Sequence, residues 1–231
     1  MLFTSINFLY YFLPTVLVLY FIVPKKAKNF VLFVASMVFY FYGEPKYILL
    51  MLAEIIIAYI GAIVIDKRKK KSVLVIVMAI HIGLLIFFKY TDFLITNINS
   101  IFNVQIKLLQ LALPIGISFY TFQILSYEVD VYRGTVKVQK NLLNLATYVS
   151  LFPQLIAGPI VRYETVEKEL TDREHSFENF AYGARRFTIG LAKKILIANI
   201  LGDVCNKFTV ADEKTVILLD VCNFIYVTNI F

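Results

Sequence analysis

The sequence predicts an all-α integral membrane protein with several transmembrane helices. Hydrophobic residues make up 59% of the 231 residues, and charged residues make up only 17%, against about 25% in soluble domains. Long stretches of the chain carry few charges, and a helix needs about 20 such residues to cross a hydrocarbon core about 30 Å thick. The formal net charge of +7 is typical of basic cytoplasmic loops in a membrane protein and does not indicate nucleic-acid binding.

Five apolar stretches are long enough, or nearly so, to form transmembrane helices. Each is apolar on all sides, which is typical of a lipid-embedded or deeply buried helix. Glu54 is the one Asp, Glu, Lys or Arg within them, and His81 is the one histidine. We predict these helices at residues 6–23, 30–42, 47–65, 72–88 and 108–127.

Basic residues are concentrated in alternate loops. Three lysines follow the first predicted helix, an unbroken basic run at residues 67–71 follows the third, and Arg133, Lys137 and Lys140 follow the fifth. The loops between these have little net charge. Because cytoplasmic loops carry the excess of Lys and Arg, the alternation predicts five crossings with the N-terminus outside.

A sixth apolar stretch, residues 141–161, is followed by a loop rich in Arg and Lys and is interrupted by Pro153, Gly158 and Pro159. Proline breaks a helix, and non-helical backbone at membrane depth occurs only inside protein or beside water. We therefore predict a broken or re-entrant helix that returns to the cytoplasmic side. The alternative is a proline-kinked helix that crosses the membrane.

Backbone groups that a broken helix releases often line substrate paths. We therefore assign a candidate substrate path to Gln154, Gly158, Pro159 and Arg162. Arg162 would present a fixed positive charge to a phosphate-bearing acyl donor. The alternative is a helix end with a snorkelling arginine.

Residues 177–200 have the pattern of an amphipathic helix. Apolar residues recur at spacings of three and four, Ser176 is a suitable N-cap, and Arg and Lys occupy the remaining face. Such a helix is suited to the cytoplasmic membrane interface, and packing against the other helices is a compatible alternative.

Glu54 and His81 are predicted to contact each other near the middle of the membrane. His81 lies ten residues past Lys71, about 15 Å, and Glu54 lies twelve residues before Asp66, about 18 Å from the same side. Ionisable groups at this depth are normally paired. We interpret the two as a structural pair, with a proton relay as the alternative.

Three long motifs together are similar to a known family. They read LPIGISFYTFQILSYEVDVYRG from Leu113, NLLNLATYVSLFPQLIAGPIVRY from Asn141 and GLAKKILIAN from Gly190. The chain resembles the membrane-bound O-acyltransferase family, and within it the branch of alginate-type polysaccharide O-acetyltransferases. The N-terminal part agrees, with FLYYFLPTVLVLYFIVP from Phe8, FYGEPKY from Phe41 and FFKYTDFL from Phe87.

The resemblance implies a multi-pass enzyme of the bacterial inner membrane that transfers an acyl group, acetyl in this branch, across the membrane to sugar hydroxyls. It implies acetyl-CoA or an acyl-carrier thioester as donor, no bound cofactor, a polysaccharide acceptor, membrane lipid, and periplasmic or extracellular partner proteins. Transfer of D-alanine to teichoic acid is the alternative within the family. A transporter or channel-like subunit is the alternative outside it.

The catalytic histidine of the family lies in a segment like Phe-Trp-Arg-Arg-Trp-His. This sequence contains no Trp, and its two histidines, His81 and His175, lie in other contexts. Residues 209–231 do not match the family pattern. We therefore expect residues 1–208 to be the N-terminal part of the acyltransferase domain and residues 209–231 to be a divergent tail left by truncation or a frameshift. We expect no catalytic residue and no metal site in this chain, and no activity from it alone.

Overall fold

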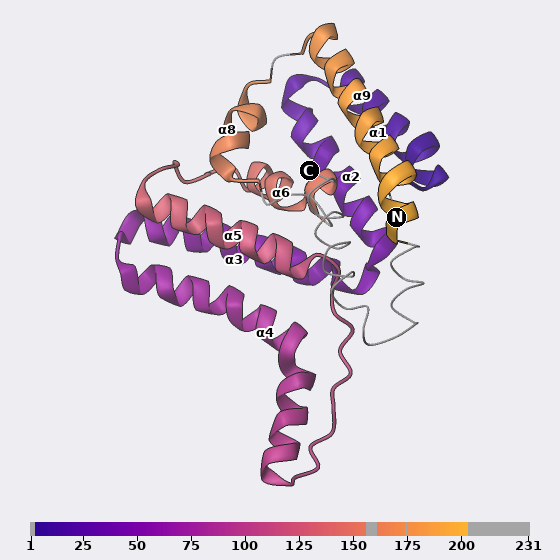
Figure 1. The fold of residues 1–231 in the computed structure, drawn as a ribbon. Coiled ribbons are helices and arrows are strands. Elements are labelled where there is room, and N and C mark those ends of the chain that lie inside the picture. Colours follow the sequence, from indigo (N-terminus) through magenta and orange to yellow (C-terminus); the bar gives the residue numbers. More distant parts are fainter. Residues whose placement is uncertain (1–2, 156–160, 174, 203–231) are drawn as a thin grey trace. The chain divides into compact units, whose positions relative to one another are not determined.

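The computed structural model describes residues 3–155, 161–173 and 175–202, most of which are helical (Figure 1). These ranges contain no β-strand. The chain forms two compact units, one with described residues 7–155 and 161–173 and the other with residues 3–6 and 175–202. The expected boundary at residue 208 and the tail at 209–231 lie outside the described residues.

The first three long helices lie close to the predicted ranges. A π-helical stretch, η1 (Asn7–Phe12), continues into α1 (Leu13–Ile22), which ends where Val23 becomes extended before Pro24. A 3₁₀ turn, η2 (Lys25–Ala27), leads into α2 (Lys28–Gly43). A second 3₁₀ turn, η3 (Pro45–Tyr47), leads into α3 (Ile48–Arg68), which ends at Lys69 in the left-handed conformation.

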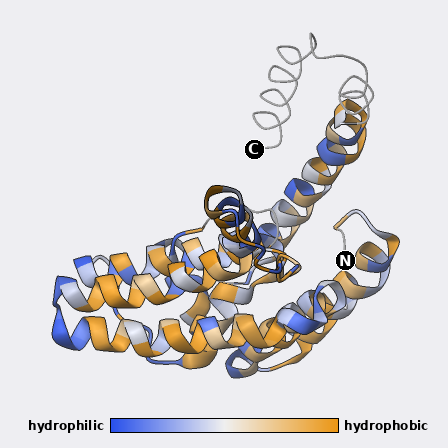
Figure 2. Cartoon of the chain, turned by 90° about the horizontal axis from the view of Figure 1, so that it is seen from below, coloured by the Kyte–Doolittle hydropathy of each residue, from blue (hydrophilic) through white to orange (hydrophobic). Residues whose placement is uncertain are grey.

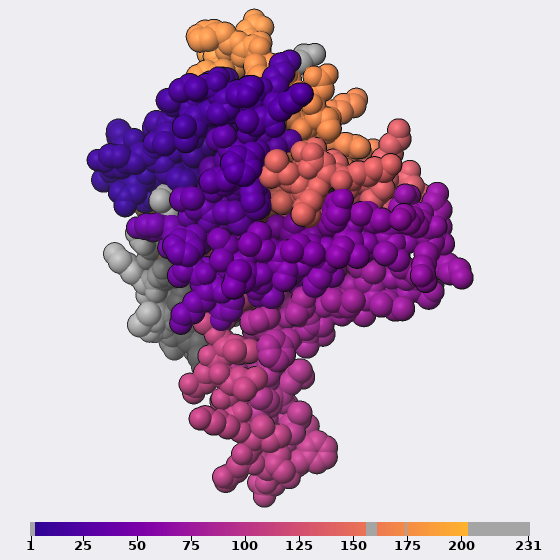
Figure 3. Space-filling model, turned by 180° about the vertical axis from the view of Figure 1, so that it is seen from behind, coloured from indigo at the N-terminus to yellow at the C-terminus, as the bar shows by residue number. Residues whose placement is uncertain are grey.

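The fourth helix is longer than the prediction of residues 72–88. Helix α4 (Lys71–Phe102) continues for 14 residues past Phe88, so the predicted loop is wrong over 89–102. No glycine or proline follows Gly83 within this helix, and apolar residues continue on its surface. It ends at Asn103, which has a φ of 53°. The second half of α4 and the chain that follows it project from the rest of their unit (Figures 1 and 3).

The prediction of a helix at residues 108–127 is wrong at both ends. Residues 103–116 are not helical, and α5 (Ile117–Arg133) begins after Gly116, whose φ is 79°. Pro114 favours an extended residue before it, so the helix starts only after this turn. Helix α5 continues past residue 127 and ends at Gly134, where the backbone N–H donates to the carbonyl groups of Asp130 and Val131.

The predicted break within residues 141–161 lies inside the described part of that segment. Helix α6 (Leu142–Ser150) starts at Asn141, whose side chain caps the N–H of Leu143, and α7 (Phe152–Leu155) follows after a break at Leu151. Residues 156–160, including Gly158 and Pro159, lie outside the described residues. Helix α8 (Tyr163–Thr171) completes the first unit.

The second unit contains the predicted amphipathic helix. Helix α9 (Phe177–Ala192) continues into a π-helical stretch, η4 (Lys193–Ala198). The hydroxyl of Ser176 accepts a hydrogen bond from the N–H of Asn179 at 3.0 Å, which confirms the predicted N-cap. None of the residues of α9 is buried.

The core of the first unit lies between α3, α4, α5 and α6, where side chains such as Met51, Ala58, Tyr120 and Leu145 are fully buried. Large apolar side chains are also exposed on these helices, among them Ile56, Ile76 and Phe122. Figure 2 shows hydrophobic residues along most of the length of the helices. Two described helical stretches, Pro45–Arg68 and Lys71–Phe102, are long and apolar enough to cross a membrane. The stretch Asn7–Ile22 is apolar but shorter.

Candidate functional site

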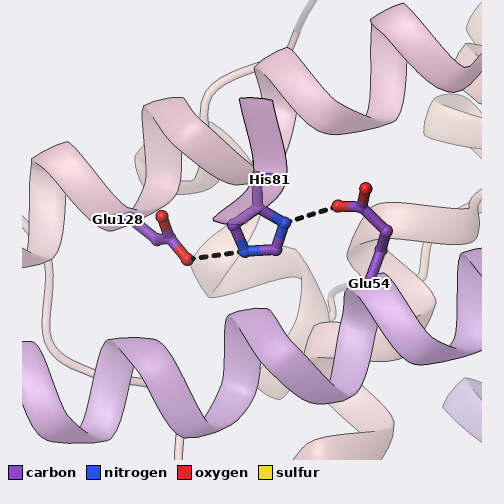
Figure 4. A network of polar contacts seen from close by, with 3 residues as sticks. All are labelled: Glu54, His81 and Glu128. Carbon is purple, nitrogen blue, oxygen red and sulfur yellow. Dashed lines mark hydrogen bonds and ion pairs between the residues drawn. The ribbon is translucent and has the colours of Figure 1, made fainter. Parts of the chain in front are cut away.

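Three ionisable side chains with no exposed surface meet between α3, α4 and α5 (Figure 4). The Nδ1 atom of His81 lies 2.5 Å from Oε2 of Glu54. Its Nε2 atom lies 3.1 Å from Oε1 of Glu128. The structure thus brings together the two residues that the sequence analysis paired and adds Glu128 as a third member. We call these three residues the buried cluster.

The turn between α3 and α4 explains why two members of the buried cluster meet. Lys69 reverses the chain within two residues, so α3 and α4 run antiparallel and side by side. Glu54 and His81 are at similar distances from this turn and therefore lie at similar depth. Helix α5 packs against both helices and supplies Glu128.

Gly61 permits the close packing of α3 and α4 near the buried cluster. A Cβ atom at this position would lie 2.5 Å from Cγ1 of Val77 and 3.4 Å from Oε1 of Glu128. The first distance is a steric clash. The absence of a side chain at Gly61 therefore helps to set the spacing of the helices that carry His81 and Glu128.

The contacts of His81 limit what the buried cluster does chemically. Both ring nitrogens face a carboxyl group, so neither is free to accept a proton from a substrate hydroxyl. The imidazole is also fully buried. This arrangement is that of a polar connection between three helices, in which each ring nitrogen of the histidine has a carboxyl group as its partner.

One oxygen of each carboxyl group in the buried cluster remains without a hydrogen bond among the described residues. These atoms are Oε1 of Glu54 and Oε2 of Glu128. The buried hydroxyl groups of Tyr120 and Thr121 on α5 likewise form no hydrogen bond with the described residues. Such buried polar atoms raise the energetic cost of the site, because each has lost its contact with water.

The helix break at Leu151 forms a second polar site, built around the carbonyl group of Tyr148. In a continuous helix this carbonyl would accept the N–H of Phe152, which instead donates to Oγ of Ser36 at 3.2 Å. The carbonyl accepts the side-chain amides of Gln123 at 3.0 Å and of Gln154 at 2.7 Å. Side chains of α2, α5 and α7 thus form hydrogen bonds with the N–H and carbonyl groups that the break releases.

Of the four residues assigned to a substrate path, the structure describes two. The side-chain amide of Gln154 donates to the break, as above, and Arg162 is exposed at the start of α8. Gly158 and Pro159 lie outside the described residues, so the path itself stays a prediction.

Three tyrosines that the sequence analysis did not single out pack beside the break. The ring centroids of Tyr148 and Tyr163 are 5.1 Å apart, and those of Tyr127 and Tyr163 are 4.9 Å apart. The hydroxyl of Tyr148 donates to the carbonyl of Val161 at 2.8 Å, and that of Tyr163 accepts from the amide of Gln139 at 2.7 Å. Burial raises the pKa of Tyr163, so this hydroxyl stays protonated at neutral pH.

Comparisons with known proteins agree with the motifs. The model of the membrane-bound O-acyltransferase family matches residues 72–215. A probable alginate O-acetylase, AlgI, of Pseudomonas aeruginosa is 37% identical over 87% of this chain and 40% of its own length. The corresponding protein of Azotobacter vinelandii is 35% identical over 93% of this chain and 45% of its own.

A third relative is a peptidoglycan O-acetyltransferase of Helicobacter pylori, which is 33% identical over 86% of this chain and 45% of its own length. The chain therefore spans less than half of the length of each of these relatives. No solved structure matches the chain.

Proposed function

Because the chain belongs to the membrane-bound O-acyltransferase family, we propose that it is part of an enzyme that transfers an acetyl group across the inner membrane of a bacterium to polysaccharide hydroxyls. The observation that carries this proposal is its similarity to relatives described as an alginate O-acetylase and a peptidoglycan O-acetyltransferase. The names of both relatives describe O-acetyl transfer, and this favours acetyl over D-alanyl as the group that the enzyme transfers. The alginate-type relatives favour a polysaccharide acceptor.

Within this enzyme, the described part of the chain would act as a scaffold and as the entrance for the acyl donor. The buried cluster supports the first role, because its one histidine is enclosed by two carboxyl groups. The break at Leu151 and the exposed Arg162 support the second, with the residues 154–162 as the path of a phosphate-bearing donor. The acyl transfer step would need a general base, and the sequence lacks the tryptophan-flanked histidine segment of the family, so we expect no activity from the chain alone.

We also propose five membrane crossings with the N-terminus outside, a broken or re-entrant segment at residues 141–161, and α9 in the cytoplasmic interface. The basic loops at 25–28 and 67–71 support the orientation, and the apolar surfaces of α3 and α4 support the crossings. This orientation leaves the loop before α3 on the outer side, where the acceptor polysaccharide and the periplasmic or extracellular partner proteins would meet the enzyme.

Cysteine labelling in intact cells tests the orientation. Cys205 and Cys222 would first be replaced by serine, and single cysteines then introduced by Glu44→Cys and Lys69→Cys. We expect a membrane-impermeant maleimide to label Glu44→Cys directly and Lys69→Cys only after permeabilisation. The reverse pattern would overturn the orientation, and direct labelling of both would overturn the crossing of α3.

Chemical analysis of the cell-surface polysaccharides tests the activity. Deleting the gene should lower the acetate that mild alkali releases from these polymers, without lowering the released D-alanine. Loss of D-alanine would instead favour the D-alanyl branch, and no loss of either ester would overturn the enzymatic proposal. Returning the 231-residue chain alone should not restore acetate; if it does, the chain carries its own catalytic group.

A further inference from the structure

The structure contains an apolar groove between α1, with the η1 stretch before it, and α2. Its volume is about 660 Å³, within the range of about 300–1,000 Å³ that is usual for small-molecule sites. Two antiparallel rows of side chains form its walls, with members four residues apart along each helix. The walls consist of Asn7, Tyr11, Phe12, Thr15, Val16 and Leu19 on one side and Phe30, Val31, Val34, Ala35, Val38 and Tyr42 on the other.

The two ends of this groove differ in charge. The end at Leu19 and Phe30 adjoins the η2 turn, where Lys25 and Lys26 are exposed and form no ion pair with a described carboxylate. The opposite end is lined by the neutral groups of Asn7 and Tyr42, and the turn after Tyr42 carries Glu44 and Lys46, whose formal charges cancel. A ligand that fills the groove would therefore meet a net positive charge at one end only.

Further cations are held at the same end. The ring of Tyr20, next to Leu19, has the ammonium group of Lys28 at 4.6 Å and the guanidinium group of Arg173 at 5.8 Å. Arg173 also donates to the hydroxyl of Tyr20 at 3.4 Å. With Lys25 and Lys26 in the adjoining turn, four cationic side chains lie near the end of the chain segment that borders Leu19.

The dimensions of the groove favour a lipid chain over a protein helix. From Asn7 to Leu19 the wall is about 18 Å long, which is close to the depth of one leaflet of a core about 30 Å thick. A helix with its side chains is about 10 Å across, which is wider than a single acyl chain, so the acyl chain is the better match to a groove between two helices that pack against each other.

We propose that this groove binds an anionic phospholipid, with one acyl chain between α1 and α2 and the phosphate group at Lys25 and Lys26. A negative headgroup is attracted by the exposed Lys25 and Lys26, and the acyl chain suits the apolar walls. The site does not depend on the acyl transfer reaction, and it would couple the first two helices of the chain to the lipid composition of the membrane.

Lipid titration of the purified 231-residue chain in a neutral detergent tests this proposal. The probes are phosphatidylglycerol and phosphatidylcholine with identical acyl chains, and the readouts are lipid retained in native mass spectrometry and the melting temperature. We expect phosphatidylglycerol, and not phosphatidylcholine, to raise the melting temperature. The double variant Lys25→Gln/Lys26→Gln should bind phosphatidylglycerol about thirtyfold more weakly.

Two further variants separate a specific site from general attraction of charge. Lys67→Gln/Lys70→Gln removes two exposed lysines from the other short basic loop and should leave binding unchanged. Val34→Trp fills the groove from a side chain that is 41% exposed and should abolish binding with every lysine in place. Both variants are chosen at exposed positions so that the helical circular dichroism spectrum is retained.

Three results would overturn the proposal. Equal stabilisation by phosphatidylcholine would mean that the mouth does not select charge. Equal weakening by the two lysine pairs would reduce the effect to general electrostatic attraction. Unchanged binding by Val34→Trp would mean that the acyl chain does not occupy the groove, for example because another part of the chain fills it.

Discussion

The Nε2 atom of His81 lies 3.1 Å from Oε1 of Glu128, so a polar contact joins α4 to α5. The other ring nitrogen joins α4 to α3 through Glu54. One imidazole thus links three helices whose buried contacts are mainly between apolar side chains. A buried ionic connection of this kind contributes little net stability when complete, but removing one partner leaves the others uncompensated.

His81→Ala is therefore expected to destabilise the protein by about 3–5 kcal/mol, because it leaves two buried carboxyl groups without a partner. Thermal unfolding in detergent micelles measures the loss. Replacing all three residues by leucine is the matched control, and it should recover most of the stability because no charge is left buried. If the triple variant is as unstable as His81→Ala, the buried cluster has a role beyond balancing charge.

A double-mutant cycle tests the contact between Glu54 and His81 directly. We expect the two single alanine variants to lose more stability in sum than the double variant loses, with an interaction energy of about 0.5–3 kcal/mol. The measurement is the free energy of unfolding of the four proteins under identical conditions. Strictly additive losses would mean that the two side chains do not interact.

Gly61→Ala is expected to destabilise the protein by about 1–3 kcal/mol, because the added methyl group would overlap the side chain of Val77. Gly83→Ala on α4 is the matched control, since a Cβ atom there meets nothing within 4 Å. That variant should leave stability unchanged or raise it slightly. Adding Val77→Ala to Gly61→Ala should recover part of the loss; equal effects of the two glycine variants would contradict this account.

The two glutamines at the carbonyl of Tyr148 should act as partial substitutes for each other. Gln123→Leu or Gln154→Leu alone leaves one donor in place, so each should cost about 1 kcal/mol or less. The double variant leaves the carbonyl unpaired and should cost about 1–3 kcal/mol more than the sum of the two single losses. The free energies of unfolding of the three variants check this; an additive result would mean that the glutamines do not share the carbonyl.

Hydrophobic pattern alone placed the helices that end at strong local signals. Pro24, Pro45 and the basic turn after α3 bound the first three stretches, and the observed helices lie close to the predicted ranges. The hydrophobic pattern predicts the wrong helix bounds where an apolar stretch begins or ends at a different residue from the helix. Leu108–Leu113 is as apolar as a helix but precedes Pro114 and Gly116, and these residues delay the start of α5.

The same error hid Glu128 from the sequence analysis. The predicted helix ends at Tyr127, which leaves Glu128 just outside it. Starting α5 after Gly116 would have moved Glu128 inside the helix and at a depth where an ionisable group needs a partner. Glu54 and His81 were found because a short turn joins their helices and fixes their relative depth. The packing of Tyr127, Tyr148 and Tyr163 joins three different helices, so the spacing of residues within any one helix does not predict it.

The length of α4 has a further consequence if it crosses the membrane as proposed. Its 32 residues measure about 48 Å along the axis, and a straight helix of this length tilted by about 40° would still extend about 37 Å across the bilayer. Figure 1 shows instead that α4 bends partway along its length, which divides it into a first part that packs within the unit and a remainder that points away from it. The remainder would thus compensate for a difference between the length of the helix and the thickness of the hydrocarbon core. The distance by which it extends beyond the lipid would vary with the thickness of the bilayer.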